Sequence, residues 1–160
     1  MNLKALDSSR LKNVIKLLYN FIFKTKRRRL IVKAVFYAAV ARFRVYFFPG
    51  GRLYRYLGEK DVETGCDVPE IEQRRKIRLI TQLVARVALR VPWESKCLVQ
   101  GMVAQRLLRD YGISSTLYLG VGRDQEADNK MVAHAWVRSG PYSVCGGTGE
   151  GYAAVARFGM

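Results

Sequence analysis

The sequence predicts an α+β fold in which a central helix packs on a small antiparallel sheet, with a helical region on its N-terminal side. Three observations predict it. Apolar and small residues recur at helical spacing from Cys97 to Tyr111. Strand-like runs follow this segment and are joined by short turns. Residues 1–60, in contrast, show helical patterns that are rich in lysine and arginine.

Composition is that of a globular protein in a reducing compartment. The chain has 160 residues, of which 49% are hydrophobic, so it is long enough to bury a core as one domain. The three cysteines are too few for a disulfide scaffold, and we expect a reduced, cytoplasmic protein. The cysteines are Cys66, Cys97 and Cys145.

Charge divides the chain into two parts. Residues 1–60 hold 15 of the 28 lysines and arginines, and their only acidic residues are Asp7 and Glu59. Nearly all of the net charge of +15 therefore belongs to this part, which indicates an interaction surface. We predict a basic helical region at 1–60, packed on the core or contacting a partner, and a catalytic core at 61–160.

The basic region contains two predicted helices, 9–24 and 30–48. The second is apolar enough to be considered as a membrane span, but it carries Lys33, Arg42 and Arg44. Each central cation costs about 2.5–3.5 kcal/mol on insertion scales. A helix packed on the core, or one lying on a membrane surface, is therefore favoured over a span.

The basic run at residues 24–29 has two interpretations. It is either a solvated turn between the two helices or a patch for an acidic partner, an anionic lipid surface or nucleic acid. Nucleic-acid binding usually needs a reading element beside the charge, and the sequence shows none. We therefore do not expect a nucleic-acid partner.

The core begins with a loop at 59–69 and a helix at 70–90 that Pro92 ends. The central helix runs from Cys97 to Tyr111, and Gly112 follows it as a helix-terminating residue. Strands are predicted at 115–121, 131–138 and 142–145.

A candidate catalytic pair lies in these core elements. Cys97 opens the central helix, where unpaired backbone N–H groups and the helix dipole favour a thiolate. His134 is the only histidine of the chain and lies in a predicted strand. It shares a strand face with Trp136, while Ala133 and Ala135 share the other, and alternation does not decide which face meets the helix. The Cys97 N–H and the Trp93 indole are candidate oxyanion donors.

Two features leave room for other interpretations. A cysteine that opens a buried helix is more often a core residue than a nucleophile, and a lone strand histidine is more often structural. No Asp or Asn follows His134 in the next strand to orient the imidazole. The candidates for that third role are Ser143, Glu150, Asp128 or a backbone carbonyl.

Several motifs resemble the lasso-peptide leader peptidases, which are transglutaminase-like cysteine peptidases with a papain-like core. They cover roughly residues 70–160 and lie at 92–98 (PWESKCL), 107–113 (LLRDYGI), 119–122 (LGVG), 133–137 (AHAWV) and 145–152 (CGGTGEGY). By this resemblance the nucleophile is Cys97 and the base is His134. The family's Asp position falls near Cys145 or Gly146, so a complete triad is not carried over.

The resemblance implies that the protein cuts the leader from a ribosomally made precursor peptide, with no metal and no cofactor. A separate ATP-dependent, asparagine synthetase-like cyclase then closes the ring. Residues 1–60 show no run of alternating strands, so the resemblance implies the stand-alone form, which needs a separate, winged-helix-like leader-recognition protein. The basic helices would contact this protein, the cyclase, an acidic leader segment or a membrane surface.

Two further functions fit the same residues. A transglutaminase-like enzyme would use the Cys–His pair to transfer an acyl group to an amine instead of water. A non-catalytic scaffold would use residues 1–60 to bind a membrane or nucleic acid.

Overall fold

A computed structural model describes residues 26–48, 51–124 and 130–160, and the α+β class is confirmed. The chain divides into two compact units, residues 1–33 and residues 34–160. The division of the sequence at residue 60 stays a prediction. No helix in the described ranges has the length and apolarity needed to cross a membrane.

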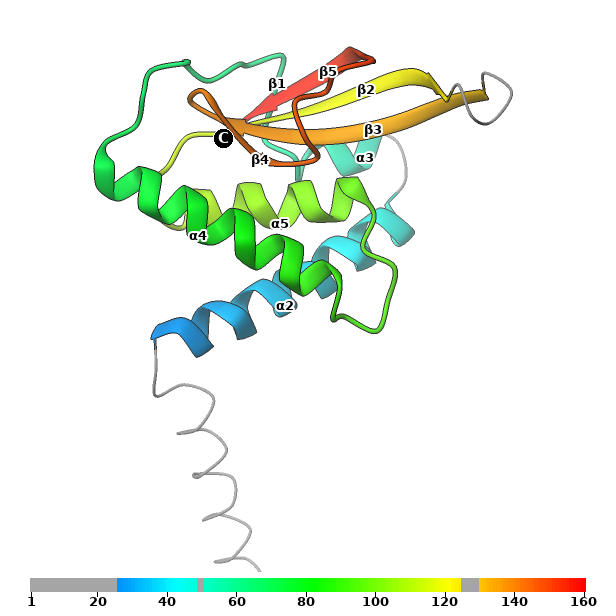
Figure 1. Cartoon of the computed structure of the whole chain (residues 1–160). Helices are drawn as coiled ribbons and strands as arrows, with labels where there is room; N and C mark the ends of the chain where they lie inside the picture. The colour runs from blue at the N-terminus through cyan, green and yellow to red at the C-terminus, as the bar shows by residue number, and fades with distance from the viewer. Residues whose placement is uncertain (1–25, 49–50, 125–129) are drawn as a thin grey trace, which may run out of the picture. The chain divides into compact units, whose positions relative to one another are not determined.

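The sheet has five strands in the order β1-β5-β2-β3-β4, and every neighbouring pair is antiparallel (Figure 1). The prediction included three of them but neither the short β1 nor β5, which lies inside the sheet between β1 and β2. The strands are β1 (Glu59–Lys60), β2 (Thr116–Asp124), β3 (Lys130–Ser139), β4 (Tyr142–Cys145) and β5 (Tyr152–Gly159).

The described helices are α2 (Lys26–Phe47), α3 (Gly51–Tyr54), α4 (Ile71–Ala88) and α5 (Cys97–Arg109). The prediction of a turn through residues 24–29 was wrong for Lys26–Arg29, which form the first turn of α2. Arginine and lysine are good helix formers, and no Gly or Pro interrupts the run, so the helix begins earlier than its apolar pattern does. The predicted helix at 9–24 lies outside the described residues.

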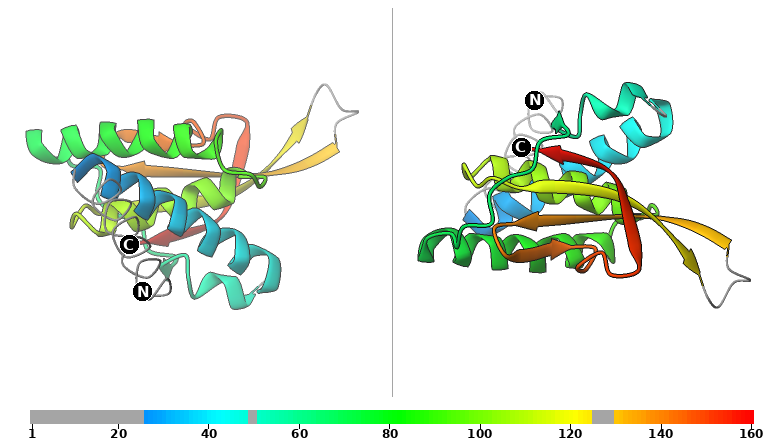
Figure 2. Two further views of the ribbon diagram at one scale, coloured as in Figure 1. Left: turned by 90° about the horizontal axis from the view of Figure 1, so that it is seen from below. Right: turned by 90° about the horizontal axis from the view of Figure 1, so that it is seen from above.

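Helices α4 and α5 cover one face of the sheet, as the two views in Figure 2 show. α5 lies against β2, β3 and β4, while α4 lies beside α5 and against β4. Gly101 lets α5 approach closely, because a Cβ atom there would lie 2.6 Å from the Leu117 side chain and 3.5 Å from that of Val137. Leu117 and Val137 are fully buried, so this is the core face of the sheet.

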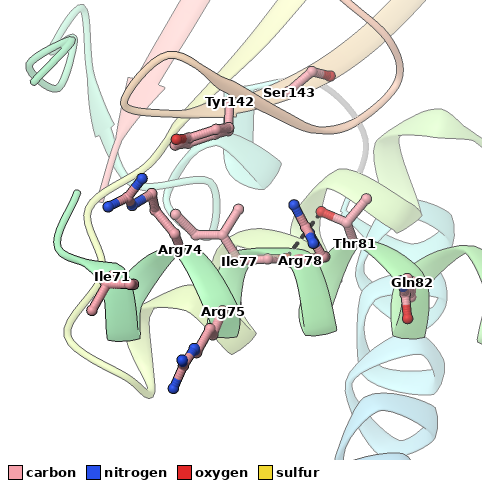
Figure 3. A pocket seen from close by; sticks show the side chains of 9 residues that line it. All are labelled: Ile71, Arg74, Arg75, Ile77, Arg78, Thr81, Gln82, Tyr142 and Ser143. Atoms are coloured by element: carbon pink, nitrogen blue, oxygen red, sulfur yellow. Dashed lines mark hydrogen bonds between the residues drawn. The ribbon is translucent and has the colours of Figure 1, made fainter. Parts of the chain in front are cut away.

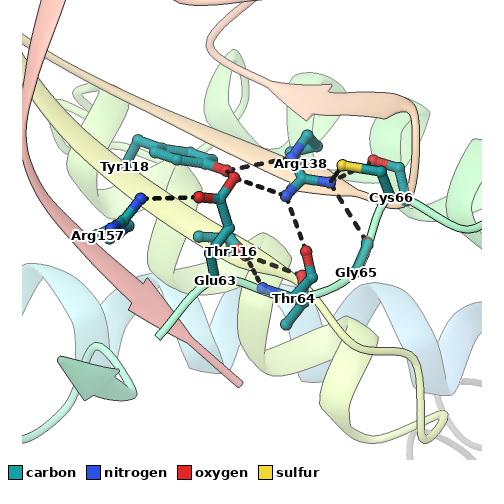
Figure 4. A network of polar contacts seen from close by, with 9 residues as sticks. Glu63, Thr64, Gly65, Cys66, Thr116, Tyr118, Arg138 and Arg157 are labelled. Carbon is teal, nitrogen blue, oxygen red and sulfur yellow. Dashed lines mark hydrogen bonds and ion pairs between the residues drawn. The ribbon is translucent and has the colours of Figure 1, made fainter. Parts of the chain in front are cut away.

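The segment after β1 crosses the opposite face of the sheet, where Glu63 holds it in place (Figure 4). Its carboxylate accepts a hydrogen bond from the Tyr118 hydroxyl and forms ion pairs of 2.9 Å with Arg138 and Arg157. The hydrogen bond from Tyr118 is the main cause that lowers the pKa of Glu63, and burial opposes it. The carboxylate therefore stays charged and links β2, β3 and β5.

The connection from β4 to β5 also crosses this opposite face, since two strands separate its ends. It runs over Trp136, because a Cβ atom on Gly149 would lie 2.4 Å from the indole. Gly146 lies at the start of the connection with a φ of +77°, a backbone conformation that residues other than glycine rarely adopt. The sharp turn at Gly146 brings its carbonyl group back over β3.

Candidate active site

Cys97 is the first residue of α5, as predicted. The first backbone hydrogen bond of the helix runs from the Gln100 N–H to the Lys96 carbonyl, so the Cys97 N–H has no partner within the helix. The Gln100 side chain donates a 2.7 Å hydrogen bond to the Ser95 carbonyl and so fixes the turn before the cysteine. The first turn of α5 has no acidic residue. A developing negative charge near this helix start would therefore meet backbone donors and no carboxylate of α5.

His134 lies on β3, with its Nε2 atom 2.7 Å from the Gly146 carbonyl oxygen. Its ring lies near two aromatic side chains, with centroid distances of 4.7 Å to Tyr152 and 6.2 Å to Trp136. These contacts hold the half-buried imidazole in one orientation.

The bond to Gly146 fixes the tautomer of the neutral imidazole. A carbonyl oxygen only accepts hydrogen bonds, so Nε2 must carry the proton and donate it. The lone pair of the neutral ring is then on Nδ1, which is the nitrogen that can accept a proton. The carbonyl group of Gly146 thus acts on His134 as an orienting group usually does on a catalytic base.

Cys145 lies near Cys97 at the edge of the sheet. It pairs with Val137, whose side chain faces α5. Burial is the main cause that raises the pKa of Cys145 to about 12, and the negative charge of a Cys97 thiolate raises it further. A hydrogen bond from the Val137 N–H opposes these effects. Cys145 is therefore a neutral thiol beside Cys97, a position that its place in the sequence did not indicate.

The structure answers the question of strand faces that alternation left open. Val137 faces α5, so residues of the other parity, including His134 and Trp136, lie on the opposite face. Cys97 and His134 therefore approach the end of β4 from opposite faces of the sheet, with Cys145 and Gly146 between them. No hydrogen bond joins Cys97 to His134 in the part of the chain that the structure describes. β4 pairs with β3 only as far as Val137, and this leaves the edge of β3 at His134 without a β4 partner.

Among the described residues, the other candidates for orienting the imidazole form no hydrogen bond with it. The Ser143 hydroxyl donates a 2.6 Å hydrogen bond to the Gly147 carbonyl, and Glu150 is exposed. Asp128 lies outside the described residues. The Trp93 Nε1–H is buried and has no hydrogen-bond partner among them, and the indole lines a groove along α2. It is thus free to donate, and its role in an oxyanion site stays a prediction.

The residue that sequence reasoning did not single out is Gly146. The resemblance places the orienting Asp near Cys145 or Gly146, and what Gly146 offers to His134 is a backbone carbonyl oxygen. The pair Gly146-Gly147 was the available signal, because consecutive glycines mark a turn that can direct a carbonyl group to an unusual place.

A comparison with protein-family models decides the family of this fold. The model described as the transglutaminase-like superfamily matches residues 51–157, which is more than half of the chain. The chain belongs to the transglutaminase-like superfamily. The curated proteins and the solved structures gave no match.

Transglutaminase-like proteins include cysteine peptidases and acyltransferases. Both reactions need a nucleophilic thiol, a base and donors for the oxyanion. In this member the match includes the start of α5 and all of β3, so Cys97 and His134 both lie inside it.

Cys97 and Cys145 are expected to differ in their reactivity toward an alkylating reagent. At pH 7.5 iodoacetamide should modify Cys97 and the exposed Cys66 while leaving Cys145 unmodified, because the thiolate is the reactive form and the pKa of Cys145 is raised to about 12. Peptide mapping by mass spectrometry measures each site. In urea all three should react. Equal rates for Cys145 and Cys66 in the folded protein would contradict the burial of the Cys145 thiol.

Proposed function

We propose that this protein is a cysteine peptidase that removes the leader from a lasso-peptide precursor before a separate cyclase closes the ring. The superfamily supports thiol chemistry, and the sequence motifs around Cys97 and His134 support the peptidase class. The observation that carries the proposal is the His134–Gly146 hydrogen bond, since it orients the imidazole and leaves its Nδ1 atom free to act as a base.

The proposed reaction has two steps. In the first step, His134 Nδ1 takes the proton of the Cys97 thiol at the edge of β3 that β4 leaves unpaired. His134 Nε2 keeps its hydrogen bond to the Gly146 carbonyl. The thiolate attacks the carbonyl carbon of the scissile peptide bond, and the Cys97 N–H, with the Trp93 indole, donates to the oxyanion. The imidazolium returns its proton to the leaving amine, which is the N-terminus of the core peptide. Water then releases the leader from the acyl-enzyme, again with His134 as the base.

The same proposal includes the partners. A separate winged-helix-like recognition protein delivers the leader, and an ATP-dependent, asparagine synthetase-like cyclase uses the freed amine. The exposed aromatic side chains of α2 support a contact of this helix with a partner or with a membrane surface. They are Phe36, Phe43, Tyr46 and Phe47, with exposed fractions from 53% to 73%.

The test is processing of a precursor in the presence of its recognition protein. Mass spectrometry should show free leader and free core whose masses sum to that of the precursor plus one water. A product joined to an added amine would instead assign acyl transfer, and an unchanged precursor would contradict both enzymatic functions. In that last case, salt-sensitive binding of anionic vesicles would favour a basic scaffold.

A further inference from the structure

We propose that the groove between α4 and β4 binds an extended acidic segment of the peptide substrate, with its carboxylates on Arg74 and Arg78. This inference names a subsite of the peptidase proposed above, and as a substrate subsite it rests on that function. The groove has a volume of 710 Å³, and Tyr142 and Ser143 of β4 line it opposite the helix (Figure 3).

The charge of the groove is positive and uncompensated. Arg75 is paired with Glu72 at 2.8 Å, whereas the guanidinium groups of Arg74 and Arg78 have no ion pair or hydrogen bond within the described part of the chain. Both side chains are exposed, and no acidic residue is among those that line the groove. An anionic ligand would therefore find two available guanidinium groups without displacing an internal partner.

The spacing of these two arginines fits an extended chain. Residues four apart on a helix are about 6 Å apart along its axis. Alternate residues of a strand are about 6.6 Å apart and point to the same side. Two carboxylates separated by one residue, as in Glu-x-Glu, would therefore each meet one arginine. The bidentate geometry of guanidinium and carboxylate adds to the selectivity.

The free edge of β4 favours a peptide over other anions. β4 is the last strand of the sheet and pairs only with β3 among the described strands. An unpaired strand edge offers backbone N–H and C=O groups to a peptide that adds as a further strand. A nucleic acid or a lipid headgroup could use the arginines but not this edge.

The groove also lies next to the candidate active site. Ser143 lines it, and Cys145 and Gly146 follow two and three residues later on the same segment. A substrate paired with β4 would thus reach the Cys97 thiol within a few residues of its acidic pair. The acidic segment would position the scissile bond, which is a role in binding and not in the chemical step.

The experiment measures peptide binding without turnover, on the full-length Cys97→Ala variant. A fluorescent peptide with a central Glu-x-Glu is titrated by anisotropy, and the same peptide with Gln-x-Gln serves as the ligand control. Replacing Arg74 and Arg78 together with glutamine should weaken binding of the acidic peptide about 100-fold, or about 10-fold for each charged pair. The Gln-x-Gln peptide should bind weakly to both proteins.

The matched control is Arg86→Gln, which removes the same charge from the same helix outside the groove. It should leave binding within about 2-fold, and thermal melting should show that all variants stay folded. Equal weakening by Arg86→Gln would overturn the proposal, because the effect would then be one of net charge. Stronger arginine-dependent binding of a single-stranded oligonucleotide or of phosphatidylserine vesicles would overturn it too.

The outcome separates this inference from the proposed function. If the protein binds the acidic peptide through Arg74 and Arg78 but wild type cleaves no precursor, the peptidase proposal fails and the groove remains a binding site. If wild type cleaves its precursor and the double variant does so with unchanged KM and kcat, the groove proposal alone fails.

Discussion

Replacing Cys97 with alanine is expected to abolish precursor cleavage, with a loss in kcat of at least about 10³-fold. Without the sulfur no acyl-enzyme forms, and the unpaired N–H groups at the start of α5 have no nucleophile beside them. Single-turnover assays with excess enzyme, followed by mass spectrometry, give the rate. The substitution removes one sulfur atom at a half-buried position, so the fold should be retained.

Cys66→Ser is the matched control for this loss. Cys66 is exposed and its sulfur lies 3.1 Å from an Arg138 guanidinium nitrogen, on the face of the sheet away from α5. The variant should cleave within about 2-fold of the wild-type rate. Residual cleavage above about one tenth in Cys97→Ala would contradict the assignment of the nucleophile.

Replacing Gly146 with alanine is expected to lower kcat about 10- to 100-fold with little change in KM. A Cβ atom there would lie 2.3 Å from the Ala135 carbonyl oxygen, and the φ of +77° disfavours any side chain. The backbone must shift, so the carbonyl that accepts the His134 Nε2–H moves and the imidazole loses its fixed tautomer. Steady-state kinetics and the pH dependence of kcat measure the effect, because a base that is no longer oriented also changes the pH profile.

Gly147→Ala is a close control, because its φ is +70° but a Cβ atom there meets nothing within 4 Å. The Gly147→Ala variant therefore has a similar backbone strain of about 1 kcal/mol, but its Cβ atom does not collide with a neighbouring atom as that of Gly146→Ala does. Its kcat should stay near that of the wild type, and thermal melting of both variants measures the shared strain. Equal losses in the two variants would show that strain alone, and not the carbonyl position, sets the rate.

Three side chains that the sequence offers for the orienting role allow a second test of the Gly146 carbonyl. Ser143→Ala, Glu150→Ala and Asp128→Ala should each leave cleavage intact. The Ser143 hydroxyl donates its hydrogen bond to the Gly147 carbonyl, and the His134 Nε2–H donates to the Gly146 carbonyl. A loss in any one of them as large as that of His134→Ala would contradict the role of the carbonyl.

The sequence alone was sufficient to predict those elements of the fold that depend on the size and type of local side chains. The helical pattern that begins at Cys97 predicted a helix packed on the sheet, and Gly112 does adopt the positive φ of a helix-terminating residue. β5 was missed because Ala153, Ala154 and Ala156 give no clear alternation of polar and apolar residues. Its position inside the sheet comes from long-range pairing with β1 and β2, which local pattern cannot reveal.

The candidate site was predictable only in part for a related reason. Cys97 and His134 are distinctive residue types in distinctive places, so the sequence indicates them directly. The group that orients His134 is a backbone carbonyl, and every residue has one. The turn that presents the Gly146 carbonyl depends on a positive φ and on the path of the β4–β5 connection across Trp136. Neither is visible without the fold.

The most direct test of the proposed function is to find the covalent intermediate. Wild-type protein, precursor and recognition protein are mixed, quenched with acid within a turnover and mapped by mass spectrometry. The proposed mechanism predicts that the proteolytic fragment containing Cys97 gains the mass of the leader minus one water, and that Cys66 and Cys145 gain none. Cleavage with the adduct on another residue, or complete cleavage by Cys97→Ala, would contradict it.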